Sequence, residues 1–245
     1  MFALEQINEE RIKFQDYTSY DIPIIQNVLY ENTNNFYAKI KKQDISNGNY
    51  VLHLSNKLDT LPLGYQKSII WHEFVHLYDT FFINLEGDDL YYALSTYSEA
   101  HAESIKLRYL LHIPLKAKIG DEIRKLIGEN GETTLYTEIN NYFKNCSAMS
   151  HIIDIHPTPE CFNLLINYFC YFCGYLFLLK KENADKKIIE ATKKLSDSHA
   201  GILLELYKVI MDKDFKECAT IYKKLHTTYK EMALNKRNFH LTKFQ

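Results

Sequence analysis

The chain has 245 residues, of which 46% are apolar and 24% charged, a composition typical of a globular protein. Its formal net charge of −2 argues against a polyanion or polycation partner for the chain as a whole. The 8 Gly and 5 Pro leave little room for long flexible linkers, and the length suits one compact domain with a helical extension.

The first third of the chain reads as a helix followed by two short strands. Residues 1–32 read as helical, with the Asp-Ile-Pro of residues 21–23 as a helix start. Residues 35–41 and 50–55 then alternate with a period near two, and the Asn-Gly within residues 43–49 is a turn signal between them. This pattern predicts a short β-hairpin or meander.

Two helices are predicted next, separated by a loop. Leu61-Pro62 opens a segment that runs to about residue 79 with apolar residues at helical spacing, and Thr60 is its candidate N-cap. Residues 81–90 read as a loop and residues 91–112 as a second helix.

From about residue 119 onward the chain reads as helical in several pieces. Residues 158–160 (Thr-Pro-Glu) and 183–185 (Asn-Ala-Asp) are helix starts. Residues 161–179 are almost continuously apolar and close in length to a bilayer span. Asn163 and Asn167, however, share one helical face, so we favour a helix buried in a bundle over a membrane span.

The cysteines and the N-terminus indicate a cytoplasmic protein. The chain has 5 cysteines, an odd number, and its first ten residues hold neither a basic start nor an apolar run. We therefore expect no secretory signal peptide and reduced thiols. Residues 180–245 hold 15 Lys/Arg against 9 Asp/Glu, but these charges are interleaved, which favours solvated helix faces over a nucleic-acid surface.

The strongest chemical signal is His72-Glu73-Phe74-Val75-His76, inside the first of the two predicted helices. Residues four apart share a helical face, so His72 and His76 can direct two imidazoles at one metal ion. Glu73 lies beside that ion, where it can act on a water molecule as general base. The flanking residues are uncharged, as a helix that must hold its ligands still requires. The alternative is a pair of histidines with purely structural roles.

A catalytic zinc site needs a third protein ligand, and the second predicted helix offers two candidates. Glu99 and Glu103 are also four apart and share a face. We assign Glu99 to the metal and Glu103 to the Nδ1 proton of a ligating histidine, an arrangement that fixes the tautomer. The reverse assignment and a purely surface role for Glu99 are the alternatives.

This motif with a downstream helical glutamate resembles the gluzincin branch of the HExxH zinc metallopeptidases. The short spacing and the Glu99-Ala100 pair are most similar to the ImmA/IrrE-type peptidases of bacteria and phages, over about residues 20–112. The chain departs from that pattern at Val75, where a glycine is common, and after Glu99, where an Asn-x-Phe-Ala is often found. The resemblance implies a strand before the metal helix, at residues 50–55, that pairs with an extended substrate.

Three further groups are weighed as parts of the site. Asp79 could ligate the metal, but a carboxylate one turn after His76 more often caps or orients a neighbour. His151 and His156 are candidates for stabilising the tetrahedral intermediate, with structural histidines as the alternative.

Two other candidates are set aside at this stage. His101 is expected to point away from the face of Glu99 and Glu103. Cys170 and Cys173 read as core sulfur, not as a redox pair, because they lie inside an apolar helix.

We therefore expect an α+β, mostly α fold, with a zincin-like core (a small antiparallel sheet plus the active-site helix) at 1–112 and a helical region at 113–245. The expected function is a cytoplasmic hydrolase, a zinc (Zn2+) metallopeptidase that cleaves peptide bonds of a protein or peptide substrate. Nucleic-acid and membrane partners are disfavoured. One alternative is a regulatory or binding protein on a zincin scaffold, which holds the metal with little general proteolysis. Another is a helical membrane-associated protein with a chance motif.

Overall fold

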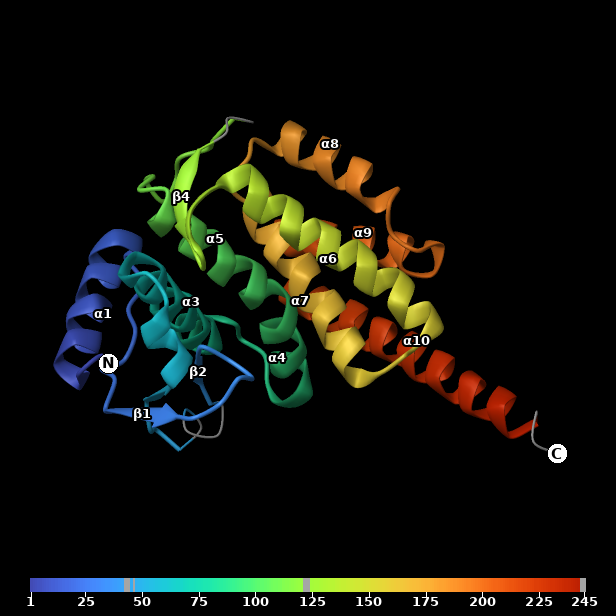
Figure 1. Cartoon of the computed structure of the whole chain (residues 1–245), viewed down its shortest axis with the longest axis horizontal. Coiled ribbons are helices and arrows are strands. Elements are labelled where there is room, and N and C mark those ends of the chain that lie inside the picture. Colours follow the sequence, from blue (N-terminus) through green and yellow to red (C-terminus); the bar gives the residue numbers. More distant parts are fainter. Residues whose placement is uncertain (42–44, 46, 121–123, 243–245) are drawn as a thin grey trace. The chain divides into compact units, whose positions relative to one another are not determined.

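The computed structural model describes residues 1–41, 45, 47–120 and 124–242. The chain packs as two compact units, each discontinuous in sequence. The first unit comprises Met1–Phe82 and His101–Glu138, and the second comprises Ile83–Ala100 and Ile139–Gln245. Helices dominate both units, and the strands belong to the first (Figure 1). The expected α+β, mostly α class is therefore confirmed, whereas the division into a core at 1–112 and a helical region at 113–245 stays a prediction.

The first unit combines helices with two small sheets. Its elements are α1 (Leu4–Thr18), β1 (Asn27–Glu31), β2 (Ala38–Ile40), β3 (Val51–Ser55), α3 (Leu63–Phe82), most of α5 (Glu99–Leu110), β4 (Lys125–Gly128) and β5 (Gly131–Thr134). A 3-10 turn at Asn56–Thr60 joins β3 to α3.

The three-stranded sheet has the order β1-β3-β2 and is mixed. β2 pairs with β3 in antiparallel fashion, which confirms the hairpin predicted for these residues. β1 runs parallel to β3, so the expectation of a purely antiparallel sheet is wrong. The prediction of helix through residue 32 is also wrong, because β1 gains its hydrogen bonds from a strand more than twenty residues away. Such long-range pairing is invisible in a local sequence window.

The turn between β2 and β3 lies partly outside the described residues, which omit 42–44 and 46. Gly48 has a φ of +71°, and its N–H donates to the Ile45 carbonyl over 2.9 Å. The Asn47-Gly48 pair thus makes a turn, as the sequence predicts, since glycine adopts positive φ without steric cost.

Aromatic packing joins α1 to α3. The Phe14 ring lies edge-on to Trp71 and Phe74, each with a centroid separation of 5.5 Å. Leu52 and Leu54 of β3 are fully buried with them, because alternate residues of a strand face the same side. This apolar core holds α3 in place along its length.

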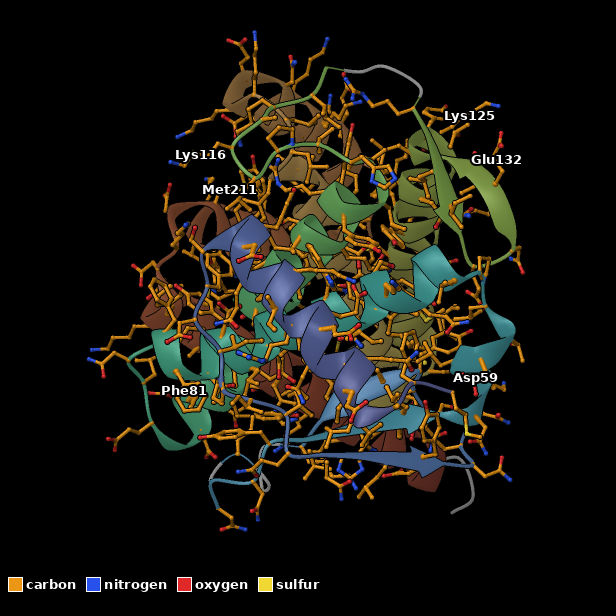
Figure 2. The ribbon with its side chains drawn as sticks, turned by 90° about the vertical axis from the view of Figure 1, so that its left-hand side faces the viewer. Asp59, Phe81, Lys116, Lys125, Glu132 and Met211 are labelled. Atoms are coloured by element: carbon orange, nitrogen blue, oxygen red, sulfur yellow. The ribbon has the colours of Figure 1, made fainter. Side chains whose placement is uncertain are left out.

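The hairpin β4–β5 replaces helix that the sequence analysis expected after residue 119. Its two strands pair in antiparallel register from Lys125↔Thr134 to Gly128↔Gly131. Figure 2 shows the side chains of Lys125 and Glu132 together at its edge, where they form an ion pair of 2.5 Å. The missed signal was Asn130-Gly131, a turn dipeptide whose glycine has a φ of +103°.

The second unit is helical throughout its described elements. They are α4 (Gly87–Ala93), a π-helical turn (Leu94–Ser98), most of α6 (Leu135–Ile155), α7 (Pro159–Leu176), α8 (Lys181–Thr192), α9 (Asp197–Asp212) and α10 (Phe215–Thr242). The predicted loop at 81–90 therefore ends early, and the predicted helix at 91–112 is interrupted by the π-turn.

Both predicted helix starts in this unit correspond to real helices. Thr158 is the N-cap of α7, and its hydroxyl accepts a hydrogen bond from the Cys161 N–H over 3.2 Å. α8 begins at Lys181, two residues before the predicted start. Among the described helices, none is long and apolar enough to cross a membrane, and this includes the apolar α7.

Candidate metal centre

The residues of the predicted metal motif converge on one face of α3. His72, Glu73 and His76 each offer a ligand atom, and these atoms lie within 4.8 Å of one another. The two imidazole rings are 4.7 Å apart at their centroids and nearly perpendicular, with an angle of 77°. His72 and Glu73 are buried, with 9% and 8% exposed, whereas His76 is only partly buried.

Two imidazoles and a carboxylate are residue types that suit a zinc ion. Two nitrogen ligands at about 2.0–2.1 Å from a tetrahedral zinc ion lie roughly 3.4 Å apart. The ligand atoms of His72, Glu73 and His76 all lie within 4.8 Å of one another, an upper limit that includes this separation. Ile70, Phe74 and Leu77 of the same helix are fully buried and anchor α3.

Glu73 contacts the edge of the three-stranded sheet. Its Oε2 accepts a hydrogen bond of 3.2 Å from the backbone N–H of Ile40 in β2. Tyr37 directs its carbonyl at Ser55 of β3, and Ile40, three residues further on, therefore directs its N–H away from β3. The outward edge of β2 thus lies next to the candidate general base.

The position of β3 corrects one expectation drawn from the resemblance. Residues 50–55 were expected to pair with an extended substrate, but β3 is the central strand and has β1 and β2 on its two sides. Its backbone groups are consequently used within the sheet. The edge that approaches the motif is β2.

Glu103 lies directly behind His72. Its Oε2 is 3.7 Å from His72 Nδ1, and its carboxylate is fully buried. This distance is just longer than a hydrogen bond, and the contact is made to Nδ1, on the side of the ring away from Nε2. A carboxylate at Nδ1 is the arrangement that orients a metal-ligating histidine.

Glu99 is the first residue of α5 and belongs to the second unit. It stands one helical turn before Glu103, so the two share a helix face. Within the second unit, burial and then the nearby thiol of Cys173 and the charge of Glu99 raise the pKa of Cys170 well above its ordinary value. The assignment of Glu99 as the third ligand stays a prediction.

Asp79 and His101 form a cluster that the sequence analysis missed. The fully buried Asp79 lies with both carboxylate oxygens 3.0 Å from His101 Nδ1. His101 Nε2 is 3.0 Å from the Tyr20 hydroxyl, and Tyr20 stacks on Tyr78 at 4.1 Å. Asp79 therefore orients His101, in line with the expectation that such a carboxylate orients a neighbour. Both residues lie in helices that the sequence predicts, but which residues of the two helices meet is decided by the tertiary fold.

Lys106 is a second residue that the sequence analysis overlooked. It is 8% exposed, and its Nζ lies 3.2 and 3.3 Å from the two oxygens of Glu103. Burial, the largest single effect, lowers the pKa of Lys106, but the charges and hydrogen bonds of Glu103 and Tyr65 together outweigh it, so this pKa is raised above the ordinary value. The ammonium also lies 5.2 Å from the Tyr65 ring centroid. The sequence could have indicated this ion pair, because Lys106 follows Glu103 by three residues in a predicted helix and such residues are neighbours on the helix surface.

The two histidines suggested for transition-state stabilisation belong to the second unit, whereas the motif belongs to the first. His151 is exposed on α6, and its Nε2 is 3.3 Å from the Lys194 carbonyl. His156 is exposed just after the end of α6. Cys170 and Cys173 are buried free thiols in α7, which agrees with their interpretation as core sulfur.

Comparison of the chain with models of known protein families gave no match, and comparison with curated proteins and with solved structures gave none either.

Proposed function

We propose that the chain is a zinc-dependent metallopeptidase that hydrolyses peptide bonds of an intracellular protein substrate. The observation that carries this proposal is the convergence of His72, Glu73 and His76 on one face of α3. The resemblance of the motif to the gluzincins, and within them to ImmA/IrrE-type peptidases, supports a zincin-like assignment of the α3 region.

Each residue of the motif has a proposed role. His72 and His76 hold the metal, and Glu99 supplies the third ligand from α5. A bound zinc ion would act as a Lewis acid that polarises a peptide carbonyl and makes a water molecule more acidic. Glu73 takes the proton of that water and passes it to the leaving amine. Its low exposure keeps this proton transfer away from bulk solvent.

The carboxylate behind His72 supports the same assignment. A histidine that binds a metal through Nε2 normally directs its Nδ1 proton at a carboxylate or carbonyl oxygen. Glu103 provides such an oxygen 3.7 Å away, from a helix other than the one that carries the motif.

The test measures zinc and proteolysis on the same preparation. The purified protein should contain close to one zinc per chain, and it should cleave members of a panel of unfolded proteins such as casein. Removal of the metal with a chelator should abolish cleavage, and added zinc should restore it. A preparation that binds no zinc at any concentration would exclude the proposal.

Zinc binding without cleavage of any substrate would favour the alternative of a regulatory or binding protein on the same scaffold. A substrate-selective peptidase gives the same result on a general panel. The two are separated by autolysis and by incubation with cell extract, in which a selective peptidase cleaves its target and a binding protein only retains it.

A further inference from the structure

Glu103 faces nitrogen atoms of two side chains at once. One is His72 Nδ1 of α3 at 3.7 Å, and the other is the Lys106 ammonium of its own helix at 3.2 Å. All three side chains are largely withdrawn from solvent, with side-chain exposures of 11% for His72, 1% for Glu103 and 11% for Lys106. In such surroundings, a carboxylate interacts strongly with each of these groups.

Lys106 supplies the full charge that balances Glu103. Removing one partner of a buried ion pair leaves the other charge uncompensated, which is strongly destabilising. A second carboxylate, Glu138, also lies near this lysine, and burial raises its pKa above the ordinary value while the lysine lowers it. Lys106 is therefore a positive charge that acts on both Glu103 and Glu138.

The two contacts of Glu103 compete for the same negative charge. An imidazole that ligates a metal carries partial positive charge and donates its Nδ1 proton more strongly than a free imidazole does. The more tightly Lys106 draws the carboxylate, the less of its charge is available to His72.

We propose that Lys106 is a positioning residue that acts through Glu103 on His72, stabilising the metal-free site and limiting its affinity for zinc. This inference rests on the proposed function, because it concerns the affinity of the same site. It predicts opposite changes in two measurable quantities when the ammonium is removed. The metal-free protein becomes less stable, and the site binds zinc more tightly.

The test is the Lys106→Met variant, which keeps most of the side-chain volume and removes the charge. We expect its zinc dissociation constant, measured by competition with a chromogenic chelator, to fall about tenfold, the lower end of what changes behind a metal ligand produce. We expect the melting temperature of the metal-free variant to lie below that of the metal-free wild type. Addition of zinc should raise the melting temperature of the variant by more than it raises that of the wild type. The Lys106→Arg variant keeps the positive charge, so its zinc affinity should equal that of the wild type.

A matched control comes from the same unit. Lys67, on α3, also pairs with a buried carboxylate, because its Nζ lies 2.7 Å from Glu10 Oε1. The Lys67→Met variant should therefore lose stability without any change in zinc affinity. A purely structural role of Lys106 would give the same pattern for Lys106→Met and would overturn the inference, as would weaker zinc binding by that variant.

A double-mutant cycle keeps the inference testable if Lys106→Met does not fold. Glu103→Gln combined with Lys106→Met removes both charges of the pair, and Lys106→Gln is a milder single change. The gain in affinity should be present in the wild-type background and absent in the Glu103→Gln background, and an equal gain in both backgrounds would contradict the inference. Failure of the proposed function gives a different result. The wild type and His72→Ala would then bind zinc equally poorly, and both the proposed function and the role of Lys106 would have to be abandoned.

Discussion

At the scale of single residues, Glu73 and the two histidines beside it differ in what their replacement should do. The histidines are the proposed metal ligands, so their loss should remove the metal and the reaction together. Glu73 is adjacent to His72 in the chain and contacts the β2 backbone at Ile40, and its proposed role is proton transfer. Its role can therefore be separated from metal binding.

The first prediction concerns this separation. Glu73→Gln keeps the size of the side chain and removes its ability to accept a proton, so zinc content should stay at the wild-type level while hydrolysis falls by about 10²- to 10⁴-fold. Metal analysis and a peptide-cleavage assay on the same sample measure both. Glu132→Gln, a change at an exposed carboxylate of β5, is the control and should leave both unchanged. Cleavage at the wild-type rate by Glu73→Gln would show that another group is the base.

The second prediction distinguishes the two glutamates of α5. Glu99→Ala should abolish zinc binding, because it removes the proposed third ligand, whereas Glu103→Gln should weaken it by about 10- to 100-fold, because it removes the carboxylate proposed to orient His72. Equilibrium dialysis against zinc measures both variants. If Glu103→Gln abolished binding and Glu99→Ala only weakened it, the two roles would have to be exchanged.

At the scale of secondary-structure elements, α1 is joined to α3 by a charged group as well as by aromatic packing. Glu10 of α1 is 4% exposed and pairs with Lys67 of α3 and with Lys13 of its own helix at 2.8 Å. Burial raises the pKa of Glu10, but hydrogen bonds from Lys13 and Lys67 outweigh it, and the net pKa lies below the ordinary value of 4.5.

The third prediction follows from that shift. A carboxyl group with a lowered pKa in the folded state contributes stability above its unfolded pKa, near 4.5, and this contribution is lost as the pH falls through the folded pKa. Glu10→Gln should therefore be destabilised by about 1–2 kcal/mol at pH 7 and should lose less further stability on acidification. Urea unfolding at pH 7 and pH 3 measures the difference. An equal acid sensitivity of both proteins would show that Glu10 does not contribute to it.

The fourth prediction concerns the start of α7. The Thr158 hydroxyl satisfies the Cys161 N–H at the helix N-terminus, so Thr158→Ala should lower the free energy of unfolding by about 1 kcal/mol. Thr158→Ser retains the hydroxyl and should remain close to the wild type. Chemical denaturation of the three proteins side by side provides the measurement, and indistinguishable midpoints would rule out the cap as a source of stability.

The sequence predicts the elements unevenly, for a physical reason. Helical spacing is visible within one window, so α3 and the N-cap of α7 are found from the sequence. The residues of β1 were expected to be helical because their pairing with β3 is not visible in a local window. The hairpin β4–β5 was missed although the turn dipeptide Asn130-Gly131 marks it. Strands gain their stability from partners that a local pattern does not show.

At the scale of the whole molecule, metal binding should couple to stability. The fifth prediction is that saturating zinc raises the melting temperature of the metal-free protein, because a ligand that binds only the folded state adds about 2.7 kcal/mol when present at a hundredfold excess over its dissociation constant. Calorimetry with and without zinc measures this effect. His72→Ala is the matched control and should show no increase, and a comparable increase in that variant would place the responsible zinc elsewhere.

The sequence by itself determined the part of the site that lies within one helix. His72, Glu73 and His76 are brought together by the helical period alone, so their convergence on α3 needed no knowledge of the rest of the fold. Glu99 and Glu103 could be proposed on the same basis, as two residues of one helix face, but not told apart.

Only the tertiary structure decided what surrounds that motif. It placed Glu103 and Lys106 behind His72, linked Asp79 to His101, and brought the Ile40 N–H to Glu73. Most of these contacts join residues of different elements, and their formation depends on how α3 packs against its neighbours. A local sequence pattern specifies which side chains share a helix face. Tertiary packing specifies which residues of other elements contact that face, and these contacts should set the metal affinity of the proposed site.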